Sequence, residues 1–528
     1  MQAPIVNASL PVVGRLVPLP RWGAWTLAAI CVVAVSARVP AMFSDFWLDE
    51  IWSLKDACGL SSSVEVFTRL ASSNNHHLYS LVFHTLGDSW SYAVYRIPAL
   101  VGGLATVLLM WLAGRASGPT HAALFAALGA CSYPLIHYSS EARGYSLAVA
   151  LAVGGFYALQ RFQVSRSSAA VVAFWLCGLL GMLSHLSYAS FLVGAFVWMA
   201  VETHEPDHRT ALRSLGRLFA VPALFGLGFL ASIAPNMVVD GADSTKVGDV
   251  LAQTLSYAAG GPGSGWAARV VGFSFLAAVS AGIVCLKLQG NRQWVLYTVI
   301  VVIWPTLLVG IIRPGALFLR YLLIPLTFGL LAFGHLLATM AERGPAWRAI
   351  VLFVLASSIV GNGLNTARLV HLGRGDYLDA VRTMAAHDAN PVITVSSDHD
   401  FRNGLTLEYY RRFVLPEKDL QYFGSAEYPA TGTQWYIKHG FAQPADVPRY
   451  YFDRRGNRFA LMQQFPTADL SGMTWYLYVR APQTPPTRPR GNPLLPGKLP
   501  GRGFGSPRFQ GRSVGGSPLV LPSGRNPR

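Results

Sequence analysis

The sequence predicts an all-α polytopic membrane protein of about eleven transmembrane helices, followed by a small C-terminal α/β domain outside the membrane and a disordered basic tail. Three observations lead to this fold class. Only 13% of the 528 residues are charged, whereas a soluble protein carries about 25%. Residues 22–370 contain many nearly uncharged runs of about 18–20 residues, the length that crosses ~30 Å of hydrocarbon. After residue 370 the composition changes and strand-like segments appear.

The first apolar run, from about Trp22 to Met42, is predicted to span the membrane as a helix, because lipid cannot hydrogen-bond an open backbone. The run is too long for the apolar region of a signal peptide, and no small-residue cleavage site precedes Asp45. Residues 1–21 then form a cytoplasmic lead-in. Residues 43–91 form a long first outer loop with local helices.

Ten further spans are expected in the predicted transmembrane domain, residues 22–370. We place them at about 92–113, 120–137, 142–159, 168–184, 187–201, 218–238, 267–286, 294–312, 321–340 and 349–369. With the N-terminus inside, Lys and Arg fall in the short cytoplasmic loops, as the positive-inside rule requires. The same topology places five loops outside: 43–91, 139–143, 184–187, 239–265 and 313–320.

Residues 371–480 are predicted to form the small α/β domain. Tyr377–His387 has the pattern of a helix, and residues 391–395 and 475–479 have the apolar, β-branched or aromatic pattern of buried strands. Residues 481–528 are rich in Pro, Gly and Arg, which predicts disorder.

The net charge of +16 is not evidence for nucleic-acid binding, and we expect no nucleic-acid partner. Half of this charge lies in the tail, which holds eight basic residues and no acidic ones. Much of the remainder lies in loops between spans, where positive residues set the topology.

Two adjacent carboxylates, Asp49 and Glu50, follow the first span. A carboxylate beside an apolar cavity holds its proton more tightly, which suits a general base acting on a hydroxyl group. We predict both residues to be catalytic, with Asp49 as the base. A helix cap or a lone ion pair at the membrane surface is the structural alternative.

The same outer loop contains the run Asn74-Asn75-His76-His77-Leu78-Tyr79. Amide and imidazole groups hydrogen-bond sugar hydroxyls well, so we predict substrate-binding roles for Asn75, His76, His77 and Tyr79. With Asp49 and Glu50 they are also a candidate metal site, but such a site needs three or four converging ligands, and adjacent His residues seldom converge.

The turn before the span at 142–159 contains Glu141, Arg143 and Tyr145. Charged residues at a membrane boundary are costly to leave unpaired. We predict that they line the same cavity as Asp49 and bind substrate. Pairing of Glu141 and Arg143 with each other or with a neighbouring helix is the alternative.

Arg313, Arg320 and Tyr321 flank the loop before the span at 321–340. The planar guanidinium fork of Arg binds phosphate, so we predict that Arg320 and Tyr321 contact a lipid phosphate. An Arg that only anchors the span at the headgroup level is the alternative. His185 and Tyr188, in a short outer turn, are expected to be structural or to line the cavity.

Together these residues resemble the family 39 glycosyltransferases of the GT-C fold, which include the protein O-mannosyltransferases and the aminoarabinose transferase of lipid A. The resemblance covers residues 38–160 best. It is carried by Arg38, Asp49-Glu50, Asn75-His76, Leu78-Tyr79, Tyr95-Arg96-Ile97-Pro98-Ala99-Leu100, Ser140-Glu141-Ala142-Arg143-Gly144-Tyr145 and Arg320-Tyr321-Leu322. The chain departs from the family at His76-His77, where many members have His-Pro-Pro, and at Gly144, where Pro is frequent.

The resemblance implies a transfer of sugar from a polyprenyl-phosphate donor to an extracytoplasmic protein, lipid or polysaccharide. Asp49 would take the proton of the acceptor, and the lipid phosphate would leave with inversion at the anomeric carbon. Glu50, Glu141 and Arg143 would shape the pocket. No cofactor is expected to be required, because an Arg can offset a single leaving phosphate; a divalent metal is the alternative.

A transporter or flippase of lipid-linked sugars is the main rival function. Such proteins tend to contain internal repeats and helices broken near the middle of the membrane, and the sequence has no clear repeat. A scaffold protein is the second rival, but it gives no reason for the positions of Asp49, Glu141 and Arg143. The expected location is the bacterial inner (plasma) membrane, with the active site on the outer side.

Overall fold

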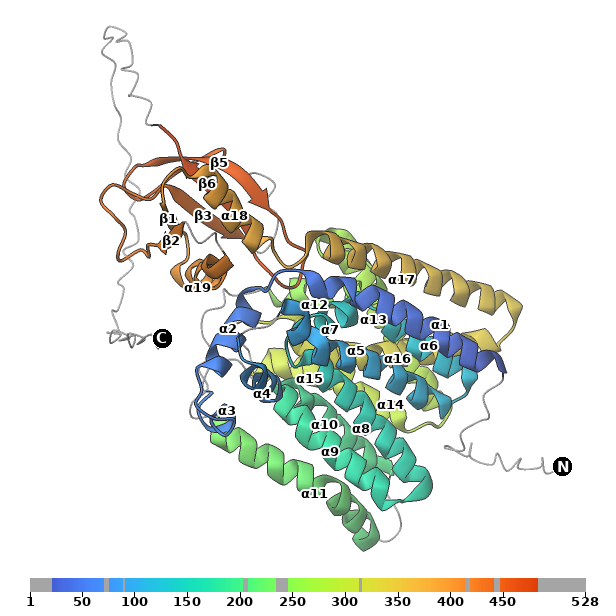
Figure 1. The fold of residues 1–528 in the computed structure, drawn as a ribbon. Coiled ribbons are helices and arrows are strands. Elements are labelled where there is room, and N and C mark those ends of the chain that lie inside the picture. The colour runs from blue at the N-terminus through green and yellow to red at the C-terminus, as the bar shows by residue number, and fades with distance from the viewer. Residues whose placement is uncertain are drawn as a thin grey trace, which may run out of the picture. The chain divides into compact units, whose positions relative to one another are not determined.

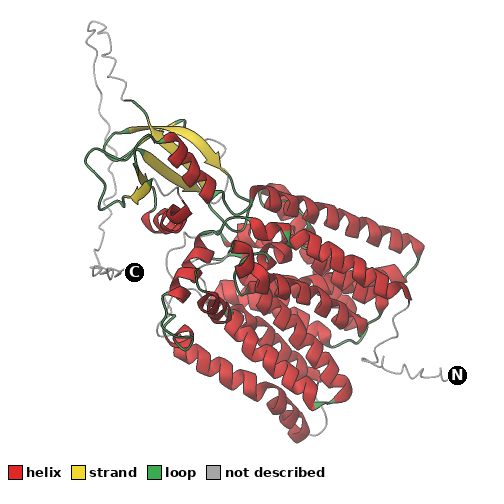
Figure 2. Cartoon of the chain, in the orientation of Figure 1, coloured by secondary structure: helices red, strands yellow, loops and turns green. Residues whose placement is uncertain are grey.

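The computed structural model of the chain describes residues 21–70, 76–88, 91–202, 208–233, 246–312, 316–413, 418–440 and 447–482 (Figure 1). Most of the predicted lead-in, the predicted tail from 483 onward, Asn75 and Arg313 lie outside these residues. The predicted fold class is confirmed: a large bundle of apolar helices precedes a small part that contains all the described strands (Figure 2).

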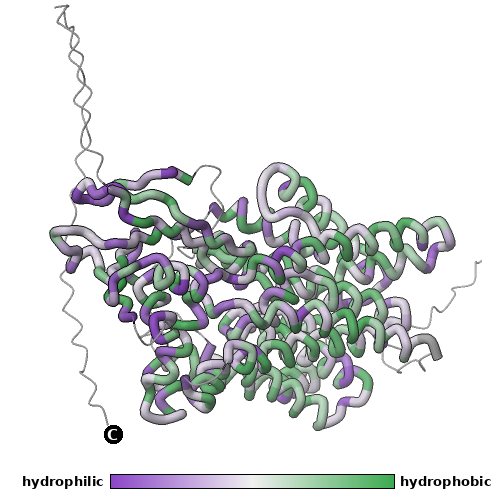
Figure 3. Tube along the Cα trace, turned by 45° about the horizontal axis from the view of Figure 1, so that its top comes forward, coloured by the Kyte–Doolittle hydropathy of each residue, from purple (hydrophilic) through white to green (hydrophobic). Residues whose placement is uncertain are grey.

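Eight helical stretches among the described residues are long and apolar enough to cross a membrane. They are Gly23–Phe43, Tyr92–Arg115, Tyr145–Ser165, Arg209–Ile233, Gly265–Leu288, Gln293–Ile311, Leu319–Glu342 and Pro345–His387. Three shorter apolar helices, Pro119–Cys131, Ser168–Ser184 and Leu186–Glu202, coincide with the other predicted spans. The chain is therefore a multi-pass membrane protein, and the hydropathy colouring shows the bundle as predominantly apolar (Figure 3).

The helices of this part keep the labels of Figure 1. Their bounds are α1 Arg21–Arg38, α2 Leu48–Cys58, α3 Glu65–Thr68, α4 His77–Leu86, α5 Tyr92–Arg115, α6 Pro119–Cys131, α7 Tyr133–Ser139, α8 Tyr145–Ser165, α9 Ser168–Ser184, α10 Ala189–Glu202, α11 His208–Ile233, α12 Val247–Ala259, α13 Gly265–Leu288, α14 Gln293–Thr298, α15 Trp304–Leu307, α16 Leu323–Glu342 and α17 Pro345–Leu372. Short 3₁₀ turns cover Pro40–Phe43, Leu186–Tyr188 and Leu319–Leu322, and π-helical turns cover Val299–Ile303 and Leu308–Ile312.

The predicted span at 120–137 is not one continuous helix. It breaks at Ser132, whose backbone is extended, into α6 and α7. Pro134 lacks an N–H group, so the carbonyl of Ala130 loses its helical donor. The buried guanidinium of Arg38 replaces that donor, with Nη1 2.9 Å from Ala130 O and Nη2 3.0 Å from Gly129 O. Arg38 therefore closes the break and ties α1 to it.

The predicted outer loop at 239–265 is partly wrong, because α12 occupies residues 247–259 within it. Its residues Tyr257 and Ala258 are buried in the main apolar core, so the segment gains tertiary packing that its Gly- and Asp-rich ends do not reveal. The helix ends at Gly260, whose φ of 88° is a left-handed conformation that suits a glycine cap.

The small C-terminal part is a six-stranded sheet with two helices. The strands are β1 Val392–Ser397, β2 Asp419–Tyr422, β3 Trp435–Gly440, β4 Tyr450–Phe452, β5 Arg458–Phe465 and β6 Thr474–Arg480, and the helices are α18 Tyr377–His387 and α19 Asp400–Tyr410. The spatial order is β2-β1-β3-β6-β5-β4; β1 runs parallel to β2 and β3, and the other pairs are antiparallel. The predicted helix 377–387 and the two predicted strands are confirmed.

The first outer loop and the sheet share one apolar core. Phe46 and Trp47, which precede α2, belong to the same buried cluster as Tyr377 of α18 and Trp435 and Trp475 of the sheet. The compact unit that contains the membrane helices accordingly extends to Ala481. The predicted boundary at residue 371 remains a prediction, and the shared core places the sheet directly against the segment that carries Asp49.

Candidate active site

Helix α2 follows the short segment 44–47, and its two carboxylates point in different directions. Trp47 is the N-cap, and Glu50 Oε2 accepts a hydrogen bond from the Trp47 backbone N–H at 3.4 Å. Asp49 and Glu50 lie in the first turn, where the helix dipole favours negative charge. Consecutive helical residues are about 100° apart around the axis, which separates the surroundings of the two side chains.

Glu50 is fully buried and its oxygens are occupied. Arg96 Nε donates to Oε1 at 2.8 Å and Nη2 donates to Oε2 at 2.6 Å, and the backbone N–H of Ala142 donates to Oε1 at 2.7 Å. The same guanidinium donates to the carbonyl oxygens of Met42, Ser44 and Asp45. Each Glu50 oxygen thus accepts two hydrogen bonds from the protein, which favours a positioning role, and the catalytic role of Glu50 stays a prediction.

Asp49 is held between two arginines from distant parts of the chain. Its Oδ2 lies 2.9 Å from Arg320 Nη1 and 3.8 Å from Arg143 Nη2. The Asp49 and Arg320 side chains are each 14% exposed, and that of Arg143 is 7% exposed. Among the described residues, Asp49 Oδ1 has no hydrogen-bond partner. One carboxylate oxygen is therefore fixed and the other is open.

Several N–H donors around Asp49 are unsatisfied. Arg143 Nη1 donates to Asp49 O at 2.9 Å and to Ser53 Oγ at 2.8 Å, but Arg143 Nε, Arg320 Nε and Trp47 Nε1 are buried without a partner among the described residues. The Arg320 guanidinium lies over Phe318 at 4.4 Å and within 6.0 Å of the Trp47 ring. Buried unpaired donors are costly, and an incoming phosphate or sugar oxygen would satisfy them.

Aromatic and imidazole rings cover one side of this cluster. His76 packs on Tyr145 at 4.5 Å and on His185 at 5.0 Å, and Tyr321 stacks on His185 at 6.1 Å. Burial, with Arg143 nearby, holds the pKa of His76 well below its usual range, so its ring is neutral. His76, Tyr145 and Tyr321 thus lie beside the arginines, where the sequence predicted substrate-binding residues.

Gly144 makes this arrangement possible. A Cβ atom there would lie 2.1 Å from Ser184 O and 2.9 Å from His76 Nδ1. The Gly144 N–H donates to His76 Nδ1 at 3.2 Å, and the same nitrogen lies 3.1 Å from Ser184 O, so the imidazole tautomer decides which contact is a hydrogen bond. The position requires glycine because the backbone of Gly144 lies too close to Ser184 O to leave space for a Cβ atom.

Two predicted substrate-binding residues do not join the cluster. His77 is the first residue of α4 and packs against Phe67 and Phe229, and both of its ring nitrogens are buried without a partner among the described residues. Tyr79 is fully buried and donates its hydroxyl to Tyr95 O at 2.5 Å. The helical geometry of α4 turns both side chains away from His76, and their substrate-binding roles stay predictions.

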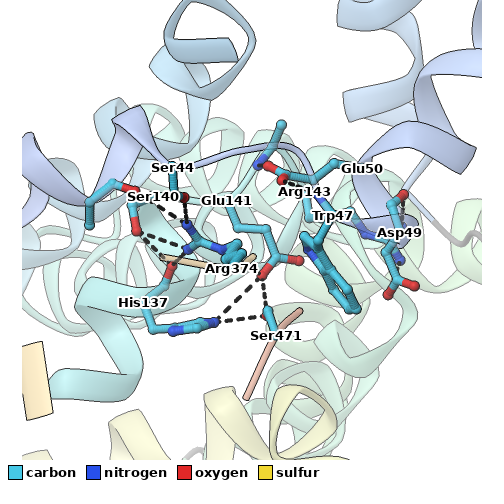
Figure 4. Close-up of polar contacts among 12 residues, drawn as sticks. Ser44, Trp47, Asp49, Glu50, His137, Ser140, Glu141, Arg143, Arg374 and Ser471 are labelled. Atoms are coloured by element: carbon cyan, nitrogen blue, oxygen red, sulfur yellow. Dashed lines mark hydrogen bonds and ion pairs between the residues drawn. The ribbon is translucent and has the colours of Figure 1, made fainter. Parts of the chain in front are cut away.

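Glu141 belongs to a second, fully buried cluster rather than pairing with Arg143 (Figure 4). Its Oε2 accepts from Ser471 Oγ at 2.7 Å and lies 3.8 Å from Arg374 Nε and 3.8 Å from His137 Nε2. Burial raises the pKa of Glu141, although Arg374 opposes this shift. Glu141 therefore connects the turn before α8 to the C-terminal part, and its substrate-binding role stays a prediction.

Arg374 is the residue that the sequence reasoning missed. It follows α17, is fully buried, and donates to Ala41 O, Ser44 Oγ, His137 O and Ser140 Oγ at 2.7–3.2 Å. It thereby joins the segment before α2 to the turn that carries Arg143. The one available signal was an Arg between Gly373 and Gly375 at the end of the last span.

Asp45 forms a further link between the outer segment and the sheet. Its Oδ2 accepts a hydrogen bond from the backbone N–H of Leu378 at 2.8 Å, at the N-terminus of α18. Burial raises the pKa of Asp45 to about 6, and the hydrogen bond from Leu378 opposes the shift. Among the residues described, no group of three His, Cys, Asp or Glu side chains could hold a metal ion.

Known proteins resemble this chain in structure but not in sequence. No family model matches the chain, and no curated protein matches it. The fold matches that of the solved structure of ArnT described below, and the predicted GT-C fold is confirmed. Membership of family 39 remains a prediction.

The solved structure of ArnT from Cupriavidus metallidurans bound to undecaprenyl phosphate matches with a TM-score of 0.50 at 12% identity, over 88% of this chain and 98% of ArnT. ArnT in the apo state matches with a TM-score of 0.48 at 12% identity, over 79% and 92%. The archaeal oligosaccharyltransferase AglB from Archaeoglobus fulgidus, in complex with an inhibitory peptide and a dolichol-phosphate, matches with a TM-score of 0.48 at 11% identity, over 79% and 69%. At this identity the likeness shows the fold alone.

Proposed function

We propose that the protein is a membrane glycosyltransferase that moves a sugar from a polyprenyl-phosphate donor to an extracytoplasmic acceptor. The observation that carries this proposal is the convergence of Arg143 and Arg320 on Asp49, with one oxygen of Asp49 left open. The GT-C fold supports the reaction class, and the open oxygen supports Asp49 as the base.

The donor phosphate belongs beside Arg320. Its guanidinium already uses Nη1 for Asp49, and its Nε has no partner among the described residues. A phosphate that draws on Arg320 and Arg143 competes with Asp49 Oδ2 for the same cations. Donor binding then weakens the ion pairs of Asp49, which raises the basicity of its carboxylate at the moment when an acceptor is to be deprotonated.

The transfer step follows from this placement. The open oxygen of Asp49 removes the proton of an acceptor hydroxyl or amine, and the acceptor atom forms a bond to the anomeric carbon. The bond between that carbon and the phosphate oxygen breaks on the opposite face, so the configuration inverts. The polyprenyl phosphate leaves with the electron pair, and the two arginines offset its developing charge.

The remaining polar residues position this machinery. Glu50 and Arg96 fix the first turn of α2, and the Glu141–Arg374 pair fixes the turn that carries Arg143. His76, Tyr145 and Tyr321 form the ring-lined wall, which we assign to sugar binding. We place the site on the outer face of a bacterial inner membrane, with a protein, a lipid or a polysaccharide as the acceptor and no required metal.

The experiment compares wild type with Asp49→Asn in detergent, using a radiolabelled polyprenyl-phosphate sugar and a membrane extract as the acceptor. Removal of a general base is expected to lower transfer by about 100-fold or more while donor binding is retained. Asp249→Asn, which removes an exposed carboxylate paired with Arg269, is the matched control and should transfer normally.

Unchanged transfer by Asp49→Asn would remove that residue from the mechanism. Donor binding without transfer in wild type, given a complete membrane extract, would instead favour a transporter of lipid-linked sugars.

A further inference from the structure

A groove of about 630 Å³ runs along α5, α8 and α9, from the level of the Asp49 cluster toward the other end of α8. Leu78, Leu147 and Leu180 line one end of it, and Arg161 and Ser167 line the other. Because α8 starts at Tyr145, beside Asp49, and ends at Ser165, the Arg161 end lies at the opposite face of the membrane. The walls include exposed apolar residues such as Val101 and Leu180, so the groove opens toward lipid.

The dimensions fit a hydrocarbon chain. Leu147 and Arg161 are fourteen residues apart on α8, which is about 21 Å along the helix axis. That length is about two-thirds of the ~30 Å hydrocarbon core, so the apolar walls can hold most of one lipid acyl chain.

Small residues form the floor of the groove. Ala150, Gly154 and Ala158 recur every fourth residue along the floor formed by α8. A Cβ on Gly154 would lie 3.3 Å from Cys177 Sγ of α9 and 3.5 Å from Leu109 Cδ1 of α5. The neighbouring helices thus already use the small-residue stripe for close packing, and what remains open is the channel between them.

The charge in the groove is confined to one end. Among the described residues that line it, Arg161 is the one charged residue. Beside it, α9 begins at Ser168, with the Ser167 hydroxyl accepting from the Ala170 N–H at 3.3 Å. Arg217 donates to Ser168 Oγ at 2.7 Å, which adds positive charge to the same helix terminus.

We propose that this groove binds an anionic membrane phospholipid, with its phosphate at Arg161 and the start of α9 and one acyl chain along α8. Basic sites between transmembrane helices bind anionic headgroups in this way. The three leucines at the far end offer no partner for a phosphate, so the headgroup is placed at the Arg161 end. The proposal stands whether or not the glycosyltransferase function is correct.

The test reconstitutes the full chain in vesicles of equimolar phosphatidylglycerol and phosphatidylcholine with identical acyl chains, extracts it into detergent, and counts bound lipid by native mass spectrometry. Wild type should retain phosphatidylglycerol over phosphatidylcholine by about fivefold or more. Phosphatidylglycerol carries a net negative charge, whereas the choline ammonium of phosphatidylcholine offsets the phosphate charge beside Arg161, and an anionic lipid gains about 1 kcal/mol per nearby Arg. Arg161→Gln should abolish this preference, and Ala173→Phe, which fills the groove, should lose both lipids.

Two variants at the same membrane depth serve as controls and should behave as wild type. Arg343→Gln removes an exposed arginine at the same membrane face, and Val172→Phe enlarges an exposed residue of α9 outside the groove. No preference in wild type, or an unchanged preference in Arg161→Gln, overturns the proposal. If added undecaprenyl phosphate displaces phosphatidylglycerol, the groove holds the donor chain and the proposal is overturned. If Ala173→Phe changes the oligomeric state and retains lipid, the groove binds a helix partner and the proposal is also overturned.

Discussion

Arg374 should be the costliest polar side chain to remove from the C-terminal part. Arg374→Met deletes the hydrogen bonds to Ala41 O, Ser44 Oγ, His137 O and Ser140 Oγ and removes the guanidinium 3.8 Å from Glu141. Breaking one side of a fully buried ion pair costs about 3–5 kcal/mol, because a charge remains buried without its partner. We therefore expect a loss of about that size in the free energy of unfolding.

A double-mutant cycle isolates the ion pair from the other contacts. Glu141→Leu alone leaves a buried guanidinium with its carbonyl acceptors, and Arg374→Met alone leaves a buried carboxylate. The double variant removes both charges, so its destabilisation should be smaller than the sum of the two single variants by about 1–3 kcal/mol. It should not return to the wild-type value, because the hydrogen bonds to Ser44 and Ser140 remain absent.

The measurement is reversible unfolding in mixed micelles, with donor transfer assayed in parallel. Arg368→Met is the matched control, because Arg368 lies near the end of α17, six residues before Arg374, and pairs with Asp469 at 3.7 Å with side chains that are 48% and 31% exposed. Such pairs contribute about 0–1 kcal/mol. The reasoning is refuted if Arg374→Met is no more destabilising than Arg368→Met, or if the cycle is additive.

Three more outcomes are expected. The pKa of Asp45 is raised to about 6, above about 3.9 in an unfolded chain. Its contribution to the free energy of unfolding is therefore complete below pH 4 and is lost as the pH rises through 6. Unfolding titrations should show wild type losing about 3 kcal/mol between pH 4 and 7.5, and Asp45→Asn should remove this loss. A Cβ on Gly144 would overlap Ser184 O, so Gly144→Ala should lose about 1–3 kcal/mol and most transfer, whereas Gly216→Ala, with open space around it, should lose neither; equal melting temperatures would contradict this. Transfer should persist in EDTA, and activity that returns only with added Mg²⁺ or Mn²⁺ would show that a metal is required.

Hydropathy predicted the membrane part well because each span must be long, apolar and helical, and those properties are local. The placement of Asp49 with Arg143 and Arg320 was also within reach, since all three were assigned to the outer ends of spans. Charged side chains are costly to leave unpaired at a membrane boundary, so these three are expected to pair with one another.

The finer division of roles was not predictable, because it depends on directions and distant contacts. Asp49 and Glu50 are neighbours in sequence, and only the helical geometry of α2 separates the open carboxylate from the buried one. Glu141 meets Ser471, which is 330 residues away, through a turn that no periodic pattern marks. His77 and Tyr79 carry suitable chemistry, but α4 turns them into packing contacts.

The apolar core shared by the outer loop and the sheet sets an order on biogenesis. The sheet is synthesised after the last span, yet Arg374 and Ser471 supply the partners of Glu141, which is made much earlier. Until the C-terminal part has docked, the turn that carries Arg143 lacks these buried contacts. A nascent or truncated chain that ends near residue 372 should therefore insert its helices and remain inactive. Activity then begins only after the C-terminal part has been synthesised and has docked.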